Sequence, residues 1–331
     1  MSKLRIGMIG CGRIAKFHVA AMAEAGLEVT AVSGSPGSTT VSDFAKKYEI
    51  PVACGDPAEL LALSSELDGV LICTSVPPTL ELLRRSLDAN LRVLVEKPVA
   101  YNSESLETFI GSSDSILVGY NRRFYQSTIR ARNDLSKKSN VLGQLVLPEG
   151  IRIMENDSDD QTYLRPFFAN SVHGLDLARS VLGDLSLQHV ERMYNDGGAL
   201  TGLAAIMVAD SGALLQFTAN FGAPANFALT LDQAGRRYDL KPFETATVYE
   251  GMDVVDPTPE MPLRQYLPRP VESIDPLPED LKFKPGFVAQ SRAFAALITG
   301  DDTGHAARIE DAHTVLCLAE ELAGTTLPNS Y

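Results

Sequence analysis

The stretch LRIGMIGCGRIAKFHVAAMAEAG, residues 4–26, decides the fold of the N-terminal region. An apolar run leads directly into the glycine turn GCGRIA, residues 10–15, and a helical pattern follows. Gly10 permits a tight turn, and Gly12 lets the backbone approach a pyrophosphate at the helix N-terminus. Ala15 stands at the third position of the dinucleotide-binding fingerprint, where alanine is an accepted variant. We therefore expect a strand–turn–helix unit that binds a dinucleotide.

The same pattern continues to about residue 120. Further apolar runs are EVTAVSG, DGVLICT, RVLVEKP and SILVGYN, and the segments SDFAKKY, PTLELLRRSLDAN and SESLETFIG between them have helical patterns. Continuous apolar strands separated by amphipathic helices predict βαβ units and a parallel sheet covered on both faces. We expect residues 1–121 to form a doubly wound Rossmann domain.

The pattern changes in the remaining chain, where strands follow one another directly. Apolar and polar residues alternate in ALLQFTANF, residues 213–221, and again in FALTLD, residues 227–232. Period-two patterning with a polar opposite face predicts a large, mostly antiparallel sheet with one open face. We expect residues 122–331 to form an α+β domain for substrate binding and oligomerisation.

Sequence patterns in this second region also predict three helices and one irregular segment. A helix is expected at Tyr125–Lys137, and two helices are expected to close the chain, around Phe287–Thr299 and Ile309–Ala323. The proline-rich segment at residues 256–280 is expected to be irregular.

Composition limits the class of protein. The 331 residues are 45% hydrophobic and 21% charged, with a net charge of −13, which indicates a globular protein and argues against a nucleic-acid partner. No apolar run approaches the roughly 18 residues that span a bilayer, and the N-terminus lacks a signal-peptide core. The four cysteines lack metal-ligand spacing, so we expect reduced thiols, a cytoplasmic location and no metal site. The acidic stretch ENDSDDQT, residues 155–162, is expected to be a solvated loop.

The end of the second strand bears on the choice of cofactor. Ser33, Gly34 and Ser35 stand where an acidic residue would bind the ribose hydroxyls of NAD. Small hydroxyl side chains leave room for a 2′-phosphate and can donate hydrogen bonds to it, although no arginine is present there to attract it. We therefore expect NADP, with NAD as the alternative.

Lys97 is the first candidate catalytic residue, in VLVEKPVA, residues 93–100. A lysine at the carboxyl end of a parallel strand lies in the crevice where open α/β sheets bind ligands, and a partly desolvated lysine can act in proton transfer. The alternative interpretation is a surface site in which Glu96 pairs with a neighbouring base.

His173 is the second candidate, in ANSVHGLDLARSVLGD, residues 169–184. We expect a helix capped by Asn170 or Ser171 and ended by Gly183, with His173 in its first turn. There the helix dipole lowers the pKa of the imidazole, and a neutral imidazole can accept a proton from an alcohol. The alternative is a structural histidine.

Neighbouring residues and the other histidines have expected roles as well. Asp176 is expected to be structural, and His18 to be solvated or at an interface. None of the other histidines has a spacing typical of metal ligands.

Four motifs in order identify a resemblance. GCGRIA, EKPV (96–99), GYNRRF (119–124) and HGLDLARSVLGD (173–184) together resemble the glucose-fructose oxidoreductase / inositol dehydrogenase (Gfo/Idh/MocA) family of NAD(P)-dependent oxidoreductases. The closing segments FKPGFVAQSRAFAALITG and IEDAHTVLCLAEEL are similar to that family's last helices, so the resemblance covers essentially the whole chain.

The resemblance implies roles for individual residues. With the two serines above, the expected cofactor-binding residues are Gly10, Gly12, Arg13, Ile14, Ser33, Ser35, Thr74, Pro77, Glu96, Lys97 and Asn121. The expected substrate-binding residues are Lys97, Asn121, Arg123, Asn170 and His173, with Arg122 as the alternative to Arg123. Lys97 and His173 would be catalytic, and the Lys97–Pro98 peptide would be cis.

Two positions depart from the family pattern. Leu80 stands where the family often has a histidine, and Ala169 stands where family enzymes commonly carry an aspartate, four residues before the catalytic histidine. The neighbouring Asn170 can hydrogen-bond a sugar hydroxyl but cannot take a proton at neutral pH.

The activity implied by the resemblance is hydride transfer between a nicotinamide cofactor and a secondary alcohol or ketone. The substrate would be a polyhydroxylated small molecule: a sugar, a cyclitol or a nucleotide-linked sugar. Two alternatives remain: a dinucleotide-binding sensor or partner subunit without turnover, which the alanine at position 169 favours, and a lyase or glycosidase with a retained NAD. The open sheet face needs cover, so a homodimer or homotetramer is expected.

Overall fold

The computed structural model describes residues 3–135, 140–149 and 164–329, which form two compact units. The first unit contains residues 1–124, 167–176 and 278–331, and the second contains residues 125–166 and 177–277. The units are thus assembled from non-contiguous segments of the chain, and the expected boundary after residue 121 stays a prediction.

The first unit is built on a six-stranded parallel sheet with the order β3-β2-β1-β4-β5-β6. Its strands are β1 Leu4–Ile9, β2 Leu27–Ser33, β3 Val52–Cys54, β4 Gly69–Ile72, β5 Arg92–Val95 and β6 Ile116–Val118. The chain order reverses between β1 and β4, which is the switch point where doubly wound sheets bind ligands. The predicted Rossmann fold is confirmed.

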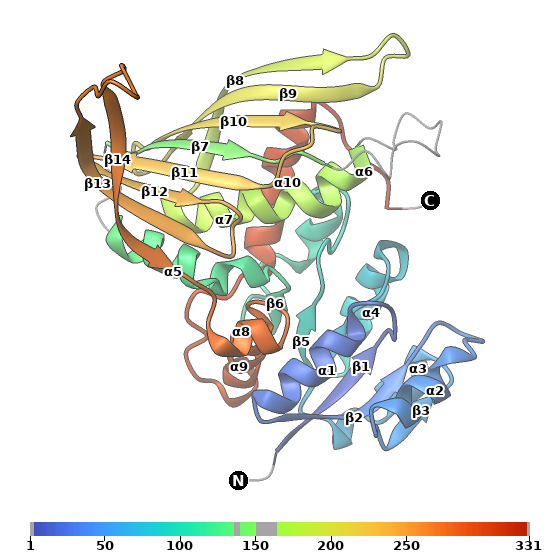
Figure 1. The fold of residues 1–331 in the computed structure, drawn as a ribbon. Coiled ribbons are helices and arrows are strands. Elements are labelled where there is room, and N and C mark those ends of the chain that lie inside the picture. The colour runs from blue at the N-terminus through green and yellow to red at the C-terminus, as the bar shows by residue number, and fades with distance from the viewer. Residues whose placement is uncertain (1–2, 136–139, 150–163, 330–331) are drawn as a thin grey trace. The chain divides into compact units, whose positions relative to one another are not determined.

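Helices connect these strands (Figure 1). They are α1 Ala15–Glu24, α2 Thr40–Lys47, α3 Pro57–Ala62 and α4 Val76–Asp88, with short 3₁₀ turns η1 Ser64–Glu66, η2 Glu104–Phe109 and η3 Asn121–Phe124. The closing helices α9 Phe287–Thr299 and α10 Ile309–Ala323 have the expected bounds.

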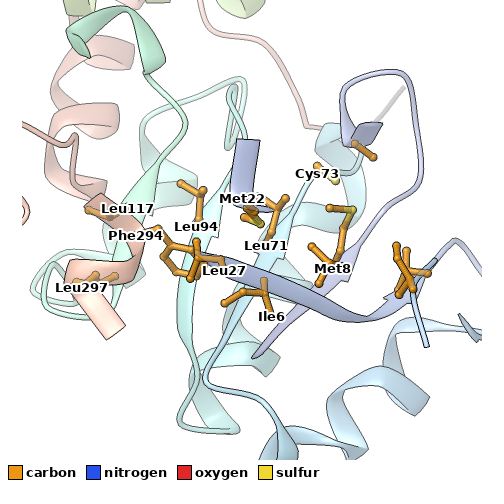
Figure 2. Close-up of a cluster of buried hydrophobic side chains, with 14 of the residues drawn as sticks. Ile6, Met8, Met22, Leu27, Leu71, Cys73, Leu94, Leu117, Phe294 and Leu297 are labelled. Atoms are coloured by element: carbon orange, nitrogen blue, oxygen red, sulfur yellow. The ribbon is translucent and has the colours of Figure 1, made fainter. Parts of the chain in front are cut away.

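Apolar side chains from the sheet and from helices α1, α2 and α9 form a core cluster of this unit (Figure 2). Ile6 and Met8 of β1 lie in the same cluster as Met22 of α1 and Phe294 of α9, and all four are fully buried. Helix α9, more than 250 residues after α1 in the chain, therefore covers the same sheet and fixes α1 behind the glycine turn.

The second unit contains an eight-stranded sheet with the order β14-β13-β12-β11-β7-β10-β9-β8. Its strands are β7 Leu142–Val146, β8 Leu185–Tyr194, β9 Leu200–Ala209, β10 Leu214–Asn220, β11 Ala228–Gln233, β12 Arg236–Leu240, β13 Ala246–Val255 and β14 Gln265–Ile274. Only β7 and β10 pair in parallel, so the expected mostly antiparallel sheet is confirmed. The predicted alternation in β10 is also present, since Leu215 and Phe217 are buried and Gln216 and Thr218 are exposed. The short helix α5 Gln126–Asp134 also belongs to this unit.

The expectation of an irregular proline-rich segment is wrong for residues 265–274. These residues form β14, which pairs antiparallel with β13 at the edge of the sheet and is drawn beside it in Figure 1. Pro268 and Pro270 are compatible with a strand here because an edge strand has one side that needs no ladder hydrogen bonds. The turn α8 Pro278–Lys282 follows in the first unit.

The helix that carries His173 begins earlier than the sequence indicates. Its helical backbone runs through α6 Leu164–Pro166, a π-helical segment at Phe167–Ser171, and α7 Val172–Leu182. The expected N-cap at Asn170 or Ser171 is therefore wrong. Gly183 ends the helix as predicted, with φ +98° and an N–H that donates to Arg179 O over 2.8 Å.

Candidate active site

The glycine turn has the geometry that an anion site requires. Gly10 adopts φ +108°, and a Cβ there would lie 2.5 Å from Cys73 O, so only glycine fits. A Cβ on Gly12 would meet no atom within 4 Å, so this glycine leaves the start of α1 open instead of serving internal packing. Helix α1 has no side-chain cap and no acidic residue in its first turn. Its N-terminal N–H groups are thus suited to a pyrophosphate.

A cavity of about 530 Å³ adjoins the turn. Its walls include Gly12, Thr74 at the exit of β4, and Ser35, Ser38 and Thr40 after β2. Ser33 is fully buried at the end of β2, and Pro77 lies exposed on α4. Of the two serines expected to bind the cofactor, Ser35 is the one that lines this cavity.

A second cavity of about 490 Å³ shares Gly12 and Thr40 with the first. Arg13 and Lys16 of the glycine turn and α1, together with Lys47 at the end of α2, contribute cations to its lining. The sequence offered no arginine next to Ser35, and the fold supplies these cations from elsewhere in the chain. Ile14, also expected at the cofactor, packs half-buried against the core. The open glycine turn and these two cavities fit a dinucleotide.

His18, on α1, lies inside the unit instead of at its surface, so the expectation of a solvated or interfacial residue is wrong. Its side chain is fully buried, its Nε2 lies 2.7 Å from Glu96 Oε1, and its ring stacks on Phe287 at 4.6 Å between centroids. Burial alone would raise the pKa of Glu96, but the hydrogen bond from His18 and the charges of His18 and Lys97 hold it below its ordinary value. The helix behind the glycine turn is thereby tied to the end of β5.

Lys97 follows β5 and points toward the π-helical segment. Its Nζ donates to Ala169 O over 3.1 Å, and its N–H donates to Glu96 Oε2 over 3.1 Å. The Lys97–Pro98 peptide is cis, as expected. The ammonium therefore binds the backbone at the position where family enzymes commonly carry an aspartate.

His173 lies one turn beyond Ala169 and is 6% exposed. The ring of Tyr120 meets it edge-on at 5.5 Å between centroids. Burial, followed by the charges of Lys97, Arg122 and Lys284, lowers the pKa of His173 well below 6.5, so the imidazole is neutral at pH 7. The expected cause was the helix dipole, and that is wrong because the helical backbone already begins at Leu164.

Arg123 and Asp176 hold α7 in place. Asp176 is fully buried, and its Oδ1 lies 2.6 Å from Arg123 Nη2. The same guanidinium lies 3.0 Å from Asp311 of α10, and these carboxylates raise the pKa of Arg123 although burial opposes this. Asp176 is structural, as predicted. Arg123 is thus engaged by two carboxylates, and the expected substrate contact at Arg123, or at its alternative Arg122, stays a prediction.

The structure describes two further expected site residues, Asn121 and Asn170, and the divergent position Leu80. Asn121 is 5% exposed and its Nδ2 donates to Pro285 O over 2.8 Å, Asn170 lies half-buried on the π-helical segment, and Leu80 lies half-buried on α4. Residues 155–162, the acidic stretch, lie outside the described residues. Within the described part of the chain, no group of three or more His, Cys, Asp or Glu residues could hold a metal ion.

Comparison with known proteins identifies relatives. Residues 4–112 match the Gfo/Idh/MocA family described as "Oxidoreductase family, NAD-binding Rossmann fold". A myo-inositol 2-dehydrogenase of Thermotoga maritima is 27% identical over 207 residues, which cover 60% of this chain and 59% of that protein. The rhizopine catabolism protein MocA of Rhizobium meliloti is 29% identical over 155 residues, which cover 44% of this chain and 46% of that protein. The matches thus span less than two thirds of either curated relative.

Solved structures share the whole fold. A dehydrogenase from Clostridium difficile superposes with a TM-score of 0.76 at 14% identity, covering 97% of this chain and 99% of that one. A UDP-N-acetylglucosamine 3-dehydrogenase from Acidithiobacillus ferrooxidans gives a TM-score of 0.73 at 16% identity, covering 98% of both chains. Residues 4–112 thus match the NAD-binding Rossmann region of the Gfo/Idh/MocA oxidoreductase family, and the solved structures share the two-sheet fold of the whole chain.

Proposed function

We propose that this protein is an NAD(P)-dependent dehydrogenase or reductase that acts on a secondary alcohol or ketone of a polyhydroxylated small molecule. One observation carries the proposal: a buried, neutral His173 lies one helical turn from the carbonyl that binds the Lys97 ammonium at the end of β5. Through Glu96 and His18, this lysine is connected to the helix that follows the glycine turn.

The chemistry divides between the cofactor and the chain. When bound, the nicotinamide supplies the hydride acceptor or donor. His173 takes the hydroxyl proton during alcohol oxidation and returns it during ketone reduction, and Lys97 stabilises negative charge on the same oxygen. Asn170 and one of the two arginines, Arg123 or its alternative Arg122, orient the substrate.

The test is turnover with a panel of sugars and cyclitols, followed through the absorbance of the reduced nicotinamide. We expect at least one member to reduce NADP⁺ or NAD⁺. Unchanged activity in both Lys97→Ala and His173→Ala would refute the assigned mechanism.

We propose NADP as the preferred cofactor. Two features support it: Ser35 stands in place of an acidic ribose ligand, and the adjoining cavity, which shares Thr40 with the first, is lined by three cations, Arg13, Lys16 and Lys47, against one acid, Asp43. Cations there would bind a 2′-phosphate that NAD lacks. We expect kcat/KM to be higher with NADPH than with NADH, and we expect Lys16→Gln to lower the ratio of the two values. A wild-type ratio of NADPH to NADH below one would reverse the assignment.

A second candidate, a dinucleotide-binding sensor or partner subunit, is favoured by Ala169, which provides no carboxylate beside Lys97. Tight NADPH binding without oxidation by any ketose, inosose or keto acid would support the sensor and contradict the dehydrogenase.

We further propose that a second copy of this chain covers the open sheet face. The outward residues of the adjacent strands β9, β10 and β7 are uncharged; they include Ile206, Val208, Leu214, Gln216, Thr218, Leu142 and Gln144. In a chain of net charge −13, an uncharged face is where two copies can meet with least repulsion. The molar mass from light scattering should be that of a dimer or tetramer, and Ile206→Asp should weaken the association between the copies. A wild-type monomer at micromolar concentration would contradict this.

We propose that this protein works in the cytoplasm. The four cysteines are free, which supports the proposed cytoplasmic location. Among the described helices, none is long and apolar enough to cross a membrane.

A further inference from the structure

The connection that carries Lys97 is held by residues more than 200 positions further along the chain. Residues 96–103 lead from β5 to η2 and contain no helix or strand, so their backbone groups need partners elsewhere. Helix α10 and the segment that follows it, residues 324–329 (the α10 extension), provide such partners. The position of this connection is therefore set by a distant part of the same unit.

Two side chains bind the backbone of the connection. Glu320, in the last turn of α10, accepts hydrogen bonds from the N–H of Ser103 over 2.8 Å and from its hydroxyl over 2.6 Å. Asn329, in the extension, accepts a hydrogen bond from the N–H of Tyr101 over 2.6 Å. Its amide nitrogen donates to the hydroxyl of Ser105, in η2, over 2.7 Å. Each of the two side chains thus binds two groups, which fixes its own orientation as well.

The chain between Lys97 and these bonds is packed into the unit. Val99 and Ala100 are buried, at 2% and 0% exposure. The carbonyl of Leu327, which is itself buried, accepts a hydrogen bond from the side chain of Asn102 over 2.8 Å. Because closely packed interiors transmit strain, a shift of the extension would be passed on to Lys97.

The other end of α10 is connected to the helix that carries His173. Asp311, in the first turn of α10, lies 3.0 Å from the guanidinium of Arg123. The same guanidinium lies 2.6 Å from Asp176, three residues after His173. One helix is therefore bonded to the element of His173 at its first turn and to the connection of Lys97 at its last turn.

We propose that α10 and its extension position Lys97 relative to His173 for the reaction, and that Glu320 and Asn329 are positioning residues. This inference rests on the proposed dehydrogenase function and assigns to it two residues that are not expected to touch the substrate or the cofactor. The proposed chemistry requires the ammonium and the imidazole to reach the same substrate oxygen. Because such proximity effects depend steeply on geometry, a displacement of about 1 Å can cost roughly 100-fold in rate. A single helix that is bonded to both elements limits that displacement.

Leucine variants at the two positions test this assignment. Asn329→Leu and Glu320→Leu remove the hydrogen-bonding groups and keep side chains of similar size. We expect each variant to lower kcat about tenfold, with unchanged NADPH affinity and a cooperative thermal unfolding transition. The matched control is Thr325→Ala, because Thr325 is exposed in the same extension and its hydroxyl donates to the neighbouring Thr326 O over 3.4 Å. This control should retain wild-type kcat. Wild-type kcat in both leucine variants would overturn the proposal.

A conservative variant separates hydrogen bonding from charge. Glu320→Gln can still accept from the N–H of Ser103 with its carbonyl, and its amide can donate to the Ser103 hydroxyl. We expect Glu320→Gln to retain most of the wild-type kcat. Ser103→Ala, which removes the hydroxyl bond and leaves the N–H bond, should lie between Glu320→Gln and Glu320→Leu. If Glu320→Gln loses as much kcat as Glu320→Leu, the assignment of Glu320 is wrong.

The loss in kcat should act through Lys97. In a Lys97→Met background, Asn329→Leu should therefore lower kcat little further, whereas an unrelated structural effect would multiply with the loss of the lysine. A further loss of about tenfold in the double variant would contradict the positioning role.

A second measurement needs neither cofactor nor substrate. Lys97 is one of the cations that lower the pKa of His173, so displacement of its ammonium should raise that pKa. We expect an NMR titration of the ring protons to show a raised pKa of His173 in Asn329→Leu and in Lys97→Met, and the wild-type pKa in Thr325→Ala. A wild-type pKa in Asn329→Leu together with a raised pKa in Lys97→Met would contradict the proposal.

Failure of this inference is distinguishable from failure of the proposed function. If the wild-type chain turns over no member of the panel, the dehydrogenase is wrong and positioning for that reaction falls with it. If the wild-type chain turns over a substrate and the leucine variants match it in kcat and in the pKa of His173, only this inference is wrong.

Discussion

His18 and His173 are both buried in the first unit, and their surroundings have opposite charge. His18 is fully enclosed, with the Glu96 carboxylate 2.7 Å from its Nε2. His173 is 6% exposed and is influenced by three cations. The Glu96 carboxylate holds the His18 ring in a fixed hydrogen bond, whereas burial and neighbouring cations favour the neutral form of His173. Both histidines are buried, so burial alone does not distinguish a candidate proton acceptor from a structural histidine, and the neighbouring groups must be compared as well.

After the loss of His173 itself, the greatest effect on turnover is expected from the loss of Lys97. Lys97→Met removes the cation that stabilises charge on the reacting oxygen, and we expect kcat to fall by about 10²–10³-fold. Steady-state kinetics with the best substrate of the panel measure it. The surface variant Lys282→Met is the control and should retain wild-type kcat; a Lys97→Met enzyme with wild-type kcat would remove the lysine from the mechanism.

The largest loss in the free energy of unfolding is expected when the ion pair between Arg123 and Asp176 is broken. Arg123→Met leaves the fully buried Asp176 without its guanidinium, which should cost about 3–5 kcal/mol in the free energy of unfolding. Urea denaturation measures this loss. Arg84, whose pairs with Glu81 and Asp88 are exposed, provides the matched control, and its replacement by Met should have little effect. Equal midpoints for the two variants would contradict the assigned anchor.

A smaller effect is expected at the partner of His18. Glu96→Gln replaces a charge-assisted hydrogen bond with a neutral one, and we expect a loss of about 1–3 kcal/mol in the free energy of unfolding. The pKa of Glu96 is lowered in the folded protein, so its contribution is present above the ordinary glutamate pKa and is lost as the pH falls through the folded value. Thermal unfolding at several pH values should therefore show a weaker acid dependence in Glu96→Gln. An unchanged acid dependence would refute the role of this pair.

The smallest effect is a shift in pH dependence. Because burial and cations lower the pKa of His173, its imidazole should stay neutral, and alcohol oxidation should persist, below pH 6.5. The unfolded chain binds a proton there that the folded chain does not, so this histidine reduces stability as the pH falls below 6.5. An NMR titration of the histidine ring protons measures the pKa directly. A value for His173 at or above 6.5 would contradict the assigned surroundings.

The sequence predicted the features that depend on local pattern. The glycine turn, the apolar parallel strands, the alternation in β10 and the bounds of α9 and α10 all follow from residues close together in the chain. The position of Lys97 just after a parallel strand was also predicted locally, because the end of such a strand is recognisable, whereas its catalytic role stays a prediction.

The features that were missed depend on residues far apart in the chain. His18 and Glu96 are separated by 78 residues, and Arg123 and Asp176 by 53, and no periodicity connects them. The π-helical segment before His173 was missed because capping residues at 170 and 171 are compatible with a helix start. Strand β14 was missed because its prolines argue against a strand unless its place at the sheet edge is known.

We propose that His173, and not His18, exchanges the substrate proton. The most direct test measures nicotinamide reduction by His173→Asn and His18→Asn under the same conditions, with thermal unfolding as a check that both fold. We expect His173→Asn to lose about 10²–10⁴-fold in kcat while keeping wild-type affinity for NADPH. His18→Asn should lose stability and retain most of its kcat. A His173→Asn enzyme that turns over at the wild-type rate would contradict the account.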